Sequence, residues 1–178
     1  MSRMYVISGP CGCGKTTLAA AFARQLAQEE RAVYLIHGDD FHAGFVGDAV
    51  PWPEILRFNW ECILSVAGKA LERGMDVVID YVIEDEWPLL QRLAREHSAD
   101  LQYTTLTASE EALRQRLHQR GDAQLTERSL FLKTKLERMP ENQGLLLDNT
   151  GLTVPEALSR LRQLLQTDVD NPPPHGVS

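Results

Sequence analysis

Residues 9–16 read Gly9-Pro10-Cys11-Gly12-Cys13-Gly14-Lys15-Thr16, which is the pattern G-x-x-x-x-G-K-T. The stretch follows a short apolar run over residues 4–8 and precedes an alanine-rich amphipathic segment, so it is expected to link a strand to a helix. In that setting the pattern is typical of a phosphate-binding loop. Its glycines let the backbone turn several N–H groups toward one anion, and the positive end of the helix dipole adds to the attraction. A glycine-rich turn without a ligand is disfavoured, because every fixed position and both flanks are present.

The loop predicts that the chain binds a nucleoside triphosphate. Lys15 is expected to bridge the β- and γ-phosphates, and the Thr16 hydroxyl is expected to bind Mg²⁺. The other nucleotide contacts are predicted from the loop and the residue that follows it: Gly9, Pro10, Cys11, Gly12, Cys13, Gly14 and Thr17. We interpret Cys11 and Cys13 as small side chains at variable positions. A redox switch is the weaker alternative, since inward N–H groups would lower the pKa of a thiol.

Length and composition restrict the classes of protein to consider. The 178 residues fit one domain, predicted over 1–167, and the proline-bearing residues 168–178 are predicted to be a disordered tail. No apolar run approaches the ~20 residues of a membrane span, and the early first strand leaves no room for a signal peptide. We therefore expect a cytoplasmic protein without a membrane partner, as a monomer or a homodimer. The net charge of −7 argues against a nucleic-acid partner.

The hydrophobic pattern predicts strands that alternate with helices. Strands are expected at residues 4–8, 32–37, 76–82, 101–107 and 144–148, and helices at about 15–29, 53–74, 87–97, 109–121, 126–139 and 153–166. Residues 43–52 are interpreted as a loop. This alternation is typical of an α/β fold, with a parallel sheet covered by helices on both faces. Ligands of such sheets bind at the carboxyl ends of the strands.

Two of these strand ends carry aspartates. Asp39 and Asp40 follow the second strand, where a carboxylate could accept a proton from a substrate hydroxyl or hold Mg²⁺. Asp39 lies nearer the strand end and is our preferred base and metal ligand, with Asp40 and His42 as predicted substrate contacts. Asp80 ends the third strand like a Walker B carboxylate, and is expected to orient the acceptor or a magnesium-bound water. For Asp39 and Asp40 the alternative is a solvated turn, and for Asp80 it is a structural hydrogen bond. The identity of the catalytic base therefore stays open between Asp39, Asp40 and Asp80.

Arginines and an asparagine supply the last candidates. Arg116 and Arg120 lie four residues apart on one helical face, and we predict that they close over the phosphates as catalytic groups. Arg116 is also a predicted nucleotide contact, and Arg128 a predicted substrate contact. The alternative is an ordinary solvated basic face. Asn149 follows the fifth strand and is predicted to touch the adenine.

Together, the G-x-x-x-x-G-K-T loop, the aspartate after the second strand and the paired arginines resemble the small P-loop kinases. The group includes gluconate kinase, shikimate kinase, chloramphenicol phosphotransferase and adenylate-kinase-like enzymes, and the resemblance is closest to a bacterial branch often labelled predicted kinases. It covers the chain to about Gln166. It implies a three-layer P-loop NTPase fold with strand order 2-3-1-4-5, a mobile arginine lid around residues 116–128, and contact of Asp39 with Mg²⁺ or the acceptor hydroxyl.

Departures from the named relatives leave the acceptor open. Gluconate kinase has a cysteine-serine-alanine stretch where this chain has Asp80-Tyr81-Val82, and the carboxylate pair and glycine triplet of shikimate kinase are missing. The loop over residues 41–45 differs from chloramphenicol phosphotransferase. Trp52, Trp60 and Tyr81 are interpreted as acceptor contacts or, equally, as core residues.

The leading hypothesis is an ATP- and Mg²⁺-dependent phosphotransferase that moves the γ-phosphate to a small-molecule hydroxyl or phosphate. One alternative is a nucleoside, nucleotide or polynucleotide kinase. The other is a nucleotide-binding NTPase or regulator without a small-molecule acceptor.

Overall fold

A computed structural model describes residues 1–170 and the side chains of residues 1–165. Its strands are β1 (Arg3–Ser8), β2 (Val33–His37), β3 (Asp76–Asp80), β4 (Asp100–Thr107) and β5 (Leu146–Asp148). Its α-helices are α1 (Lys15–Gln28), α2 (Asp39–His42), α3 (Trp52–Glu72), α4 (Trp87–Glu96), α5 (Glu110–Arg120), α6 (Thr126–Arg138) and α7 (Val154–Asp170). Two 3₁₀ turns, Ala123–Leu125 and Pro140–Asn142, flank α6.

The five strands form one parallel sheet in the order β2-β3-β1-β4-β5. In the register of the sheet, His37 of β2 and Ile7 of β1 both lie opposite Asp80 of β3. These observations confirm the predicted α/β class and the strand order that the kinase resemblance implied. None of the helices within residues 1–170 is both long and apolar enough to cross a membrane.

The segment after β2 differs from the expected loop. Residues 39–42 form the short helix α2, and the preceding Gly38 already has helical φ and ψ of −61° and −31°. Asp39 and Asp40 occupy the first turn, where carboxylates are stabilised by the positive helix end. The predicted third strand ended at residue 82, two residues after β3 ends, and the predicted fifth strand began at residue 144, two residues before β5 begins. Apolar residues continue past the paired part of the strand at both places, which is why the pattern extended too far.

Contacts divide the chain into two compact units. The first unit comprises residues 1–7 and 19–101, and the second comprises residues 8–18 with the described residues from 102 onward. The prediction of one domain over 1–167 stays a prediction. Of the predicted tail, residues 168–170 belong to α7, and residues 171–178 lie outside the described residues.

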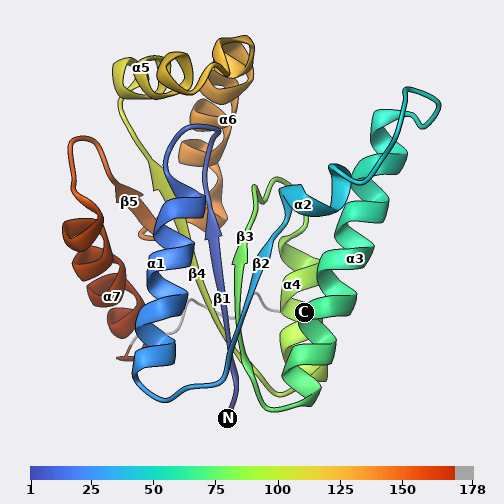
Figure 1. Cartoon of the computed structure of the whole chain (residues 1–178). Helices are drawn as coiled ribbons and strands as arrows, with labels where there is room; N and C mark the ends of the chain where they lie inside the picture. The colour runs from blue at the N-terminus through green and yellow to red at the C-terminus, as the bar shows by residue number, and fades with distance from the viewer. Residues whose placement is uncertain (171–178) are drawn as a thin grey trace. The chain divides into compact units, whose positions relative to one another are not determined.

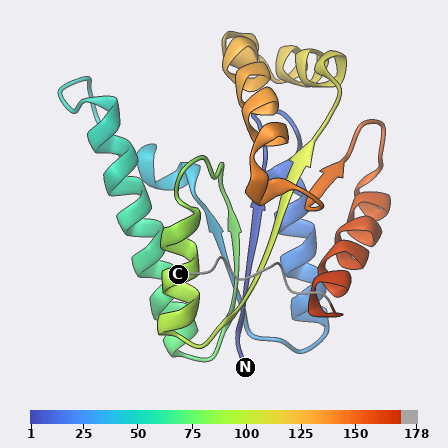
Figure 2. The same ribbon diagram turned by 180° about the vertical axis from the view of Figure 1, so that it is seen from behind.

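The first unit is built around β3, all of whose residues are buried. Both views in Figures 1 and 2 show its strands between α1 and the pair formed by α3 and α4. Asp76 is a buried carboxylate at the start of β3, and it forms an ion pair with Arg31 and accepts a hydrogen bond of 2.8 Å from the Arg3 amide. The hydrogen bond that the Arg31 side chain donates to Asp76 Oδ2 raises the pKa of Arg31. The buried charge is thus neutralised inside the unit.

The second unit contains β4, β5 and the helices α5, α6 and α7. Its helix ends follow the sequence signals: Ser109 Oγ accepts a hydrogen bond of 3.2 Å from the Ala112 amide at the start of α5. Gly121 ends that helix with a φ of 79°, which favours glycine. The predicted capping box before α7 is confirmed, because the Thr153 amide donates to Glu156 Oε2 at 2.8 Å and the Glu156 amide donates back to Thr153 Oγ1 at 3.5 Å.

Candidate functional site

The phosphate loop runs from the end of β1 into the first turn of α1, which begins at Lys15. Gly9 has a φ of 142°, and a Cβ there would lie 2.6 Å from the Leu106 carbonyl oxygen and 2.7 Å from Cys13 Sγ. Gly14 has a φ of 97°, and a Cβ there would lie 3.1 Å from Asn149 Nδ2. Both fixed glycines of the pattern are therefore required by backbone conformation and by close packing. The predicted strand–loop–helix setting is confirmed.

Side chains of the second unit hold the carbonyl groups of this loop. Ser129 Oγ donates to the Cys11 carbonyl at 2.7 Å, and Asn149 Nδ2 donates to the Cys13 carbonyl at 2.7 Å. Arg116 Nη1 donates to the same Cys13 carbonyl at 3.4 Å, and Lys15 Nζ donates to the Pro10 carbonyl at 3.1 Å. Because carbonyl oxygens repel an anion, donors that hold them fix the loop in a shape suited to phosphate.

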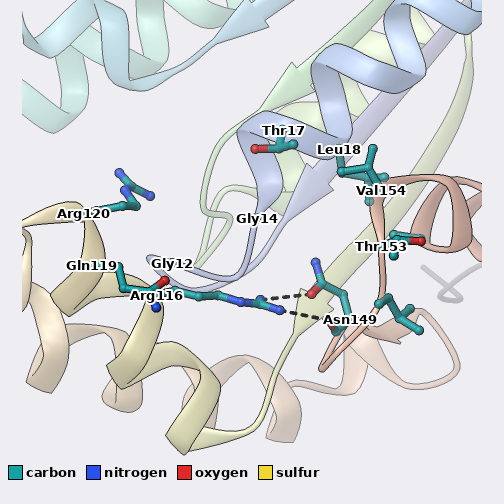
Figure 3. Close-up of a pocket in the computed structure, with 12 residues that line it drawn as sticks. Gly12, Gly14, Thr17, Leu18, Arg116, Gln119, Arg120, Asn149, Thr153 and Val154 are labelled. Carbon is teal, nitrogen blue, oxygen red and sulfur yellow. Dashed lines mark hydrogen bonds between the residues drawn. The ribbon is translucent and has the colours of Figure 1, made fainter.

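Arg116 and Asn149 form the centre of this arrangement (Figure 3). The guanidinium of Arg116 donates to Asn149 Oδ1 at 3.0 Å and to the Asn149 carbonyl at 3.1 Å. Asn149 is nearly buried, and its side-chain amide thus connects the phosphate loop with α5. The structure places both predicted nucleotide contacts beside the loop, where they hydrogen bond to each other and to the backbone.

A cavity of about 330 Å³ opens at this place within the second unit. Its lining comprises the predicted residues Gly12, Gly14, Thr17, Arg116, Arg120 and Asn149, together with Leu18, Gln119, Leu152, Thr153, Val154 and Ala157. Cavities of this size are in the range that small ligands occupy. One side is apolar and follows β5, while the other carries the loop and the arginines.

The predicted arginines differ in their surroundings. Arg120 lines the cavity with an exposed side chain, and its Nη2 lies 3.0 Å from Asp122 Oδ2. Arg128 lies on α6, where its guanidinium carbon is 5.5 Å from the centre of the Phe131 ring. Sequence reasoning missed Ser129 and the apolar residues after β5, because no local pattern marks a side chain that meets a backbone more than 100 residues away.

The predicted carboxylates lie in the first unit. Asp39 is in α2 with a side chain 76% exposed, and its Oδ1 is 3.9 Å from Nδ1 of His42. Asp80 ends β3 with a side chain only 5% exposed, and its Oδ2 is 3.1 Å from Nδ1 of His37. The pairing with His37 was not anticipated, since it depends on the register that sets the ends of β2 and β3 side by side.

Tyr81 follows Asp80 and joins the aromatic residues of the first unit. Its ring centre lies 5.3 Å from that of Trp60 in an edge-to-face contact, and Trp52 makes a similar contact with His42 at 5.8 Å. Burial raises the pKa of Tyr81 to about 12, and the Asp39 and Glu86 carboxylates add to the rise. Tyr81 and Trp60 are buried, whereas Trp52 is 56% exposed. The nucleotide candidates and Arg128 therefore lie in the second unit, and the carboxylate and aromatic candidates lie in the first.

Known proteins resemble this chain in sequence and in fold. The AAA_33 family model, described as an AAA domain, matches residues 4–146. The signal recognition particle receptor FtsY of Mycoplasma pneumoniae is 29% identical in an alignment over 98 residues that covers 51% of this chain. The match covers only 28% of that receptor's own length.

Solved structures extend the comparison over nearly the whole chain. An APS kinase of Mycobacterium tuberculosis, determined in complex with AMPPNP and APS, has a TM-score of 0.67 at 17% identity, over 93% of this chain and 98% of that one. A gluconokinase of Sinorhizobium meliloti 1021 has a TM-score of 0.57 at 19% identity, over 96% and 98% of the two chains. The tunicamycin resistance protein of Deinococcus radiodurans has a TM-score of 0.61 at 19% identity, over 94% and 95%. The chain belongs to the AAA_33 family, and its fold is that of the small P-loop kinases.

Proposed function

We propose that this chain is an ATP- and Mg²⁺-dependent phosphotransferase that moves the γ-phosphate of ATP to a hydroxyl group of a small molecule. The observation that carries the proposal is the phosphate loop at the start of α1, whose two fixed glycines are required by φ and by packing. The kinase fold and the cavity lined by Gly12, Gly14 and Arg116 support it.

The proposed roles follow the chemistry of the side chains. Lys15 and the loop amides bind the β- and γ-phosphates, and Arg116 and Arg120 neutralise charge on the phosphoryl group in transfer. The bond from the γ-phosphorus to the β–γ bridging oxygen breaks, and a new bond forms between the same phosphorus and the acceptor oxygen. ADP leaves with the bridging oxygen, and Asp39 accepts the hydroxyl proton.

Asp39 suits the role of base better than Asp80. Its carboxylate is exposed, whereas that of Asp80 is buried and lies against His37. We therefore propose that Asp80 orients the acceptor indirectly, through its contact with His37. Asp40, His42, Trp52, Tyr81 and Arg128 are proposed substrate contacts.

The donors proposed for Mg²⁺ are the Thr16 hydroxyl and the Asp39 carboxylate. Each of the two residues is exposed, and each offers an oxygen ligand of the kind that Mg²⁺ prefers. When bound, the ion neutralises charge on the phosphates. Thr16 keeps its place at the helix start because the loop glycines fix the entry into α1.

The alternatives are not favoured. A polynucleotide substrate would need a broad cationic surface, and the chain has a net charge of −7. A regulator or NTPase would release phosphate to water at a rate that no acceptor changes. The oligomeric state and the cellular location stay predictions.

Lys15→Ala tests the phosphate loop. We expect this variant to lose AMPPNP binding in a calorimetric titration and to lose ADP release in the presence of acceptors, because Lys15 is the proposed cation on the phosphates. Lys69→Ala is the matched control, since Lys69 lies on α3 and pairs with Glu72 at 3.0 Å. Wild-type affinity and turnover in Lys15→Ala would remove the loop from the mechanism.

Asp39→Asn tests the base. We expect AMPPNP binding to persist and the rate of transfer to an acceptor to fall by about 10²–10⁴, as for the loss of a general base. Asp100→Asn is the control, because Asp100 is a carboxylate of the first unit that pairs with Arg3 at 3.7 Å. Steady ATP hydrolysis in the wild type that no acceptor panel accelerates would contradict the phosphotransferase proposal.

A further inference from the structure

Two segments of the first unit, residues 37–60 and 80–87, are strongly acidic. They hold eight carboxylates and a single arginine: Asp39, Asp40, Asp48, Glu54, Asp80, Glu84, Asp85 and Glu86 against Arg57. The whole net charge of −7 therefore resides in these acidic segments, and the rest of the chain is balanced. Arg57 adds no unpaired positive charge, because its Nη2 lies 2.6 Å from Glu54 Oε1.

The two acidic segments meet at Tyr81. The Gly38 amide donates to the Asp80 carbonyl at 2.9 Å, and a Cβ on Gly38 would lie 2.4 Å from Cδ2 of Tyr81. Figures 1 and 2 both show the loop after β3 beside α2. The carboxylates of Asp39, Glu86 and Glu84 all help to raise the pKa of the Tyr81 phenol, so acids of both segments lie around it.

Asn59 points to a ligand at this place. It is fully buried in α3, and neither its amide oxygen nor its amide nitrogen makes a hydrogen bond of good geometry within the described residues. Its amide lies close enough to the Tyr81 phenol to favour the ionised form and so oppose part of the rise in pKa. A buried amide without a good partner is destabilising, which calls for a polar group that it binds.

Apolar surface accompanies these charges. The side chains of Val46, Val50, Trp52 and Phe58 are all exposed, although each is large and hydrophobic. Phe58 packs edge-to-face on Phe45 with ring centres 5.3 Å apart. Aromatic faces beside carboxylates attract organic cations, since both the ring quadrupole and the negative charge favour them.

We propose that the acceptor is a hydroxylated small molecule that carries a protonated amine and an apolar or aromatic group. This inference rests on the proposed phosphotransferase function and names its substrate class. A carboxylate- or phosphate-bearing acceptor would meet eight carboxylates and no unpaired arginine in the acidic segments. An amine gains from the same charges, and the Asn59 amide beside Tyr81 is a buried polar group without a hydrogen bond of good geometry.

Probes of similar size that carry a hydroxyl group and differ in charge test the proposal. Phenylalaninol, N-acetylphenylalaninol and phenyllactate provide a cation, a neutral molecule and an anion that share a hydroxyl and a phenyl ring. Glucosamine, N-acetylglucosamine and gluconate provide the same order of charges without a phenyl ring. Fluorescence of Trp52, Trp60 and Trp87, the three tryptophans of the chain, reports binding to the acidic segments without nucleotide.

We expect phenylalaninol to bind about tenfold more tightly than its neutral partner, phenyllactate to bind least, and NaCl to narrow the difference. Phenylalaninol should also bind more tightly than glucosamine. Glu84→Lys is expected to reduce the preference for the cation, whereas the same change at Glu141, a surface carboxylate of the second unit, leaves the preference unchanged. Urea unfolding confirms that both variants fold.

Other outcomes separate this inference from the proposed function. Equal binding of the three charges, tighter binding of the anion, or no binding of any probe at about 10 mM would overturn the amine acceptor. A preference for the cation in a protein that transfers phosphate to none of the probes, and only hydrolyses ATP, would keep the inference about binding and overturn the kinase proposal. Faster transfer of phosphate to phenyllactate or gluconate than to the amines would keep the kinase proposal and overturn the amine acceptor.

Discussion

Replacing Asn149 with alanine separates the support of the phosphate loop from the stability of the second unit. The substitution removes the hydrogen bond from Nδ2 to the Cys13 carbonyl at 2.7 Å and the bond that Oδ1 accepts from Arg116 at 3.0 Å. A neutral hydrogen bond contributes a net of about 1 kcal/mol, and one to a charged group about 1.5–3 kcal/mol. Arg116 retains its bond to the Asn149 carbonyl, so we expect unfolding to become easier by about 2.5 kcal/mol, the lower end of the sum of the two lost bonds.

The same loss should appear in nucleotide affinity. Without the amide of Asn149, the Cys13 carbonyl loses its 2.7 Å hydrogen bond and keeps the longer 3.4 Å contact with Arg116, so the loop samples shapes unsuited to phosphate. If ordering the loop when the nucleotide binds costs about 1.4–2 kcal/mol, the dissociation constant for AMPPNP rises by about 10- to 30-fold. Isothermal titration calorimetry with AMPPNP and Mg²⁺ measures this change, and urea unfolding measures the loss of stability.

Asn142→Ala is the matched control. Asn142 is a buried asparagine of the same unit, with hydrogen bonds from its Nδ2 to the Leu136 carbonyl at 2.7 Å and to its Oδ1 from Thr105 at 3.1 Å. The Asn142→Ala variant should lose about as much free energy of unfolding as Asn149→Ala, while its affinity for AMPPNP stays at the wild-type value. Equal losses of affinity in both variants, or unchanged affinity in Asn149→Ala, would refute the role of Asn149 in shaping the loop.

Two further predictions concern the first unit. Arg31→Met leaves the Asp76 carboxylate buried without its ion-pair partner, so it should lower the free energy of unfolding by about 3–5 kcal/mol. A urea titration measures this loss, and a value below about 1 kcal/mol would show that water reaches Asp76. Because the pKa of Tyr81 is raised from 10.0 to about 12, the unfolded chain ionises first above pH 10, so stability should fall between about pH 10 and 12 by up to about 2–3 kcal/mol. Tyr81→Phe should flatten this fall in chemical unfolding measured across that range, and an equal slope in both proteins would contradict the assignment.

Local signals were sufficient for the loop and for most helix ends. The phosphate loop, Ser109 before α5 and the Thr153–Glu156 capping box each act over a few residues, so the sequence displays the whole interaction. The short helix α2 was missed, because four residues are too few for a periodic pattern and aspartates favour turns and helix starts alike.

Long-range contacts were beyond reach for a different reason. The pair of His37 with Asp80 depends on the register of two strands 43 residues apart, and the bond of Ser129 to the Cys11 carbonyl spans 118 residues. Arg116 was predicted to point at phosphates, and its proximity to the loop could be inferred from the lid of related kinases. The hydrogen bonds from Arg116 to Asn149 could not be inferred, since they depend on how α5 packs against the end of β5.

The distance along the chain between the phosphate loop and its supports has a consequence for synthesis. The carbonyl groups of Cys11 and Cys13 are held by residues 103, 118 and 136 positions downstream. At ~5–20 residues per second, a ribosome makes the loop about 7–27 seconds before it makes Asn149. A nascent chain that ends at residue 101 therefore carries the G-x-x-x-x-G-K-T pattern without its supports, and ATP in the surrounding medium is expected to help only the nearly finished protein to fold.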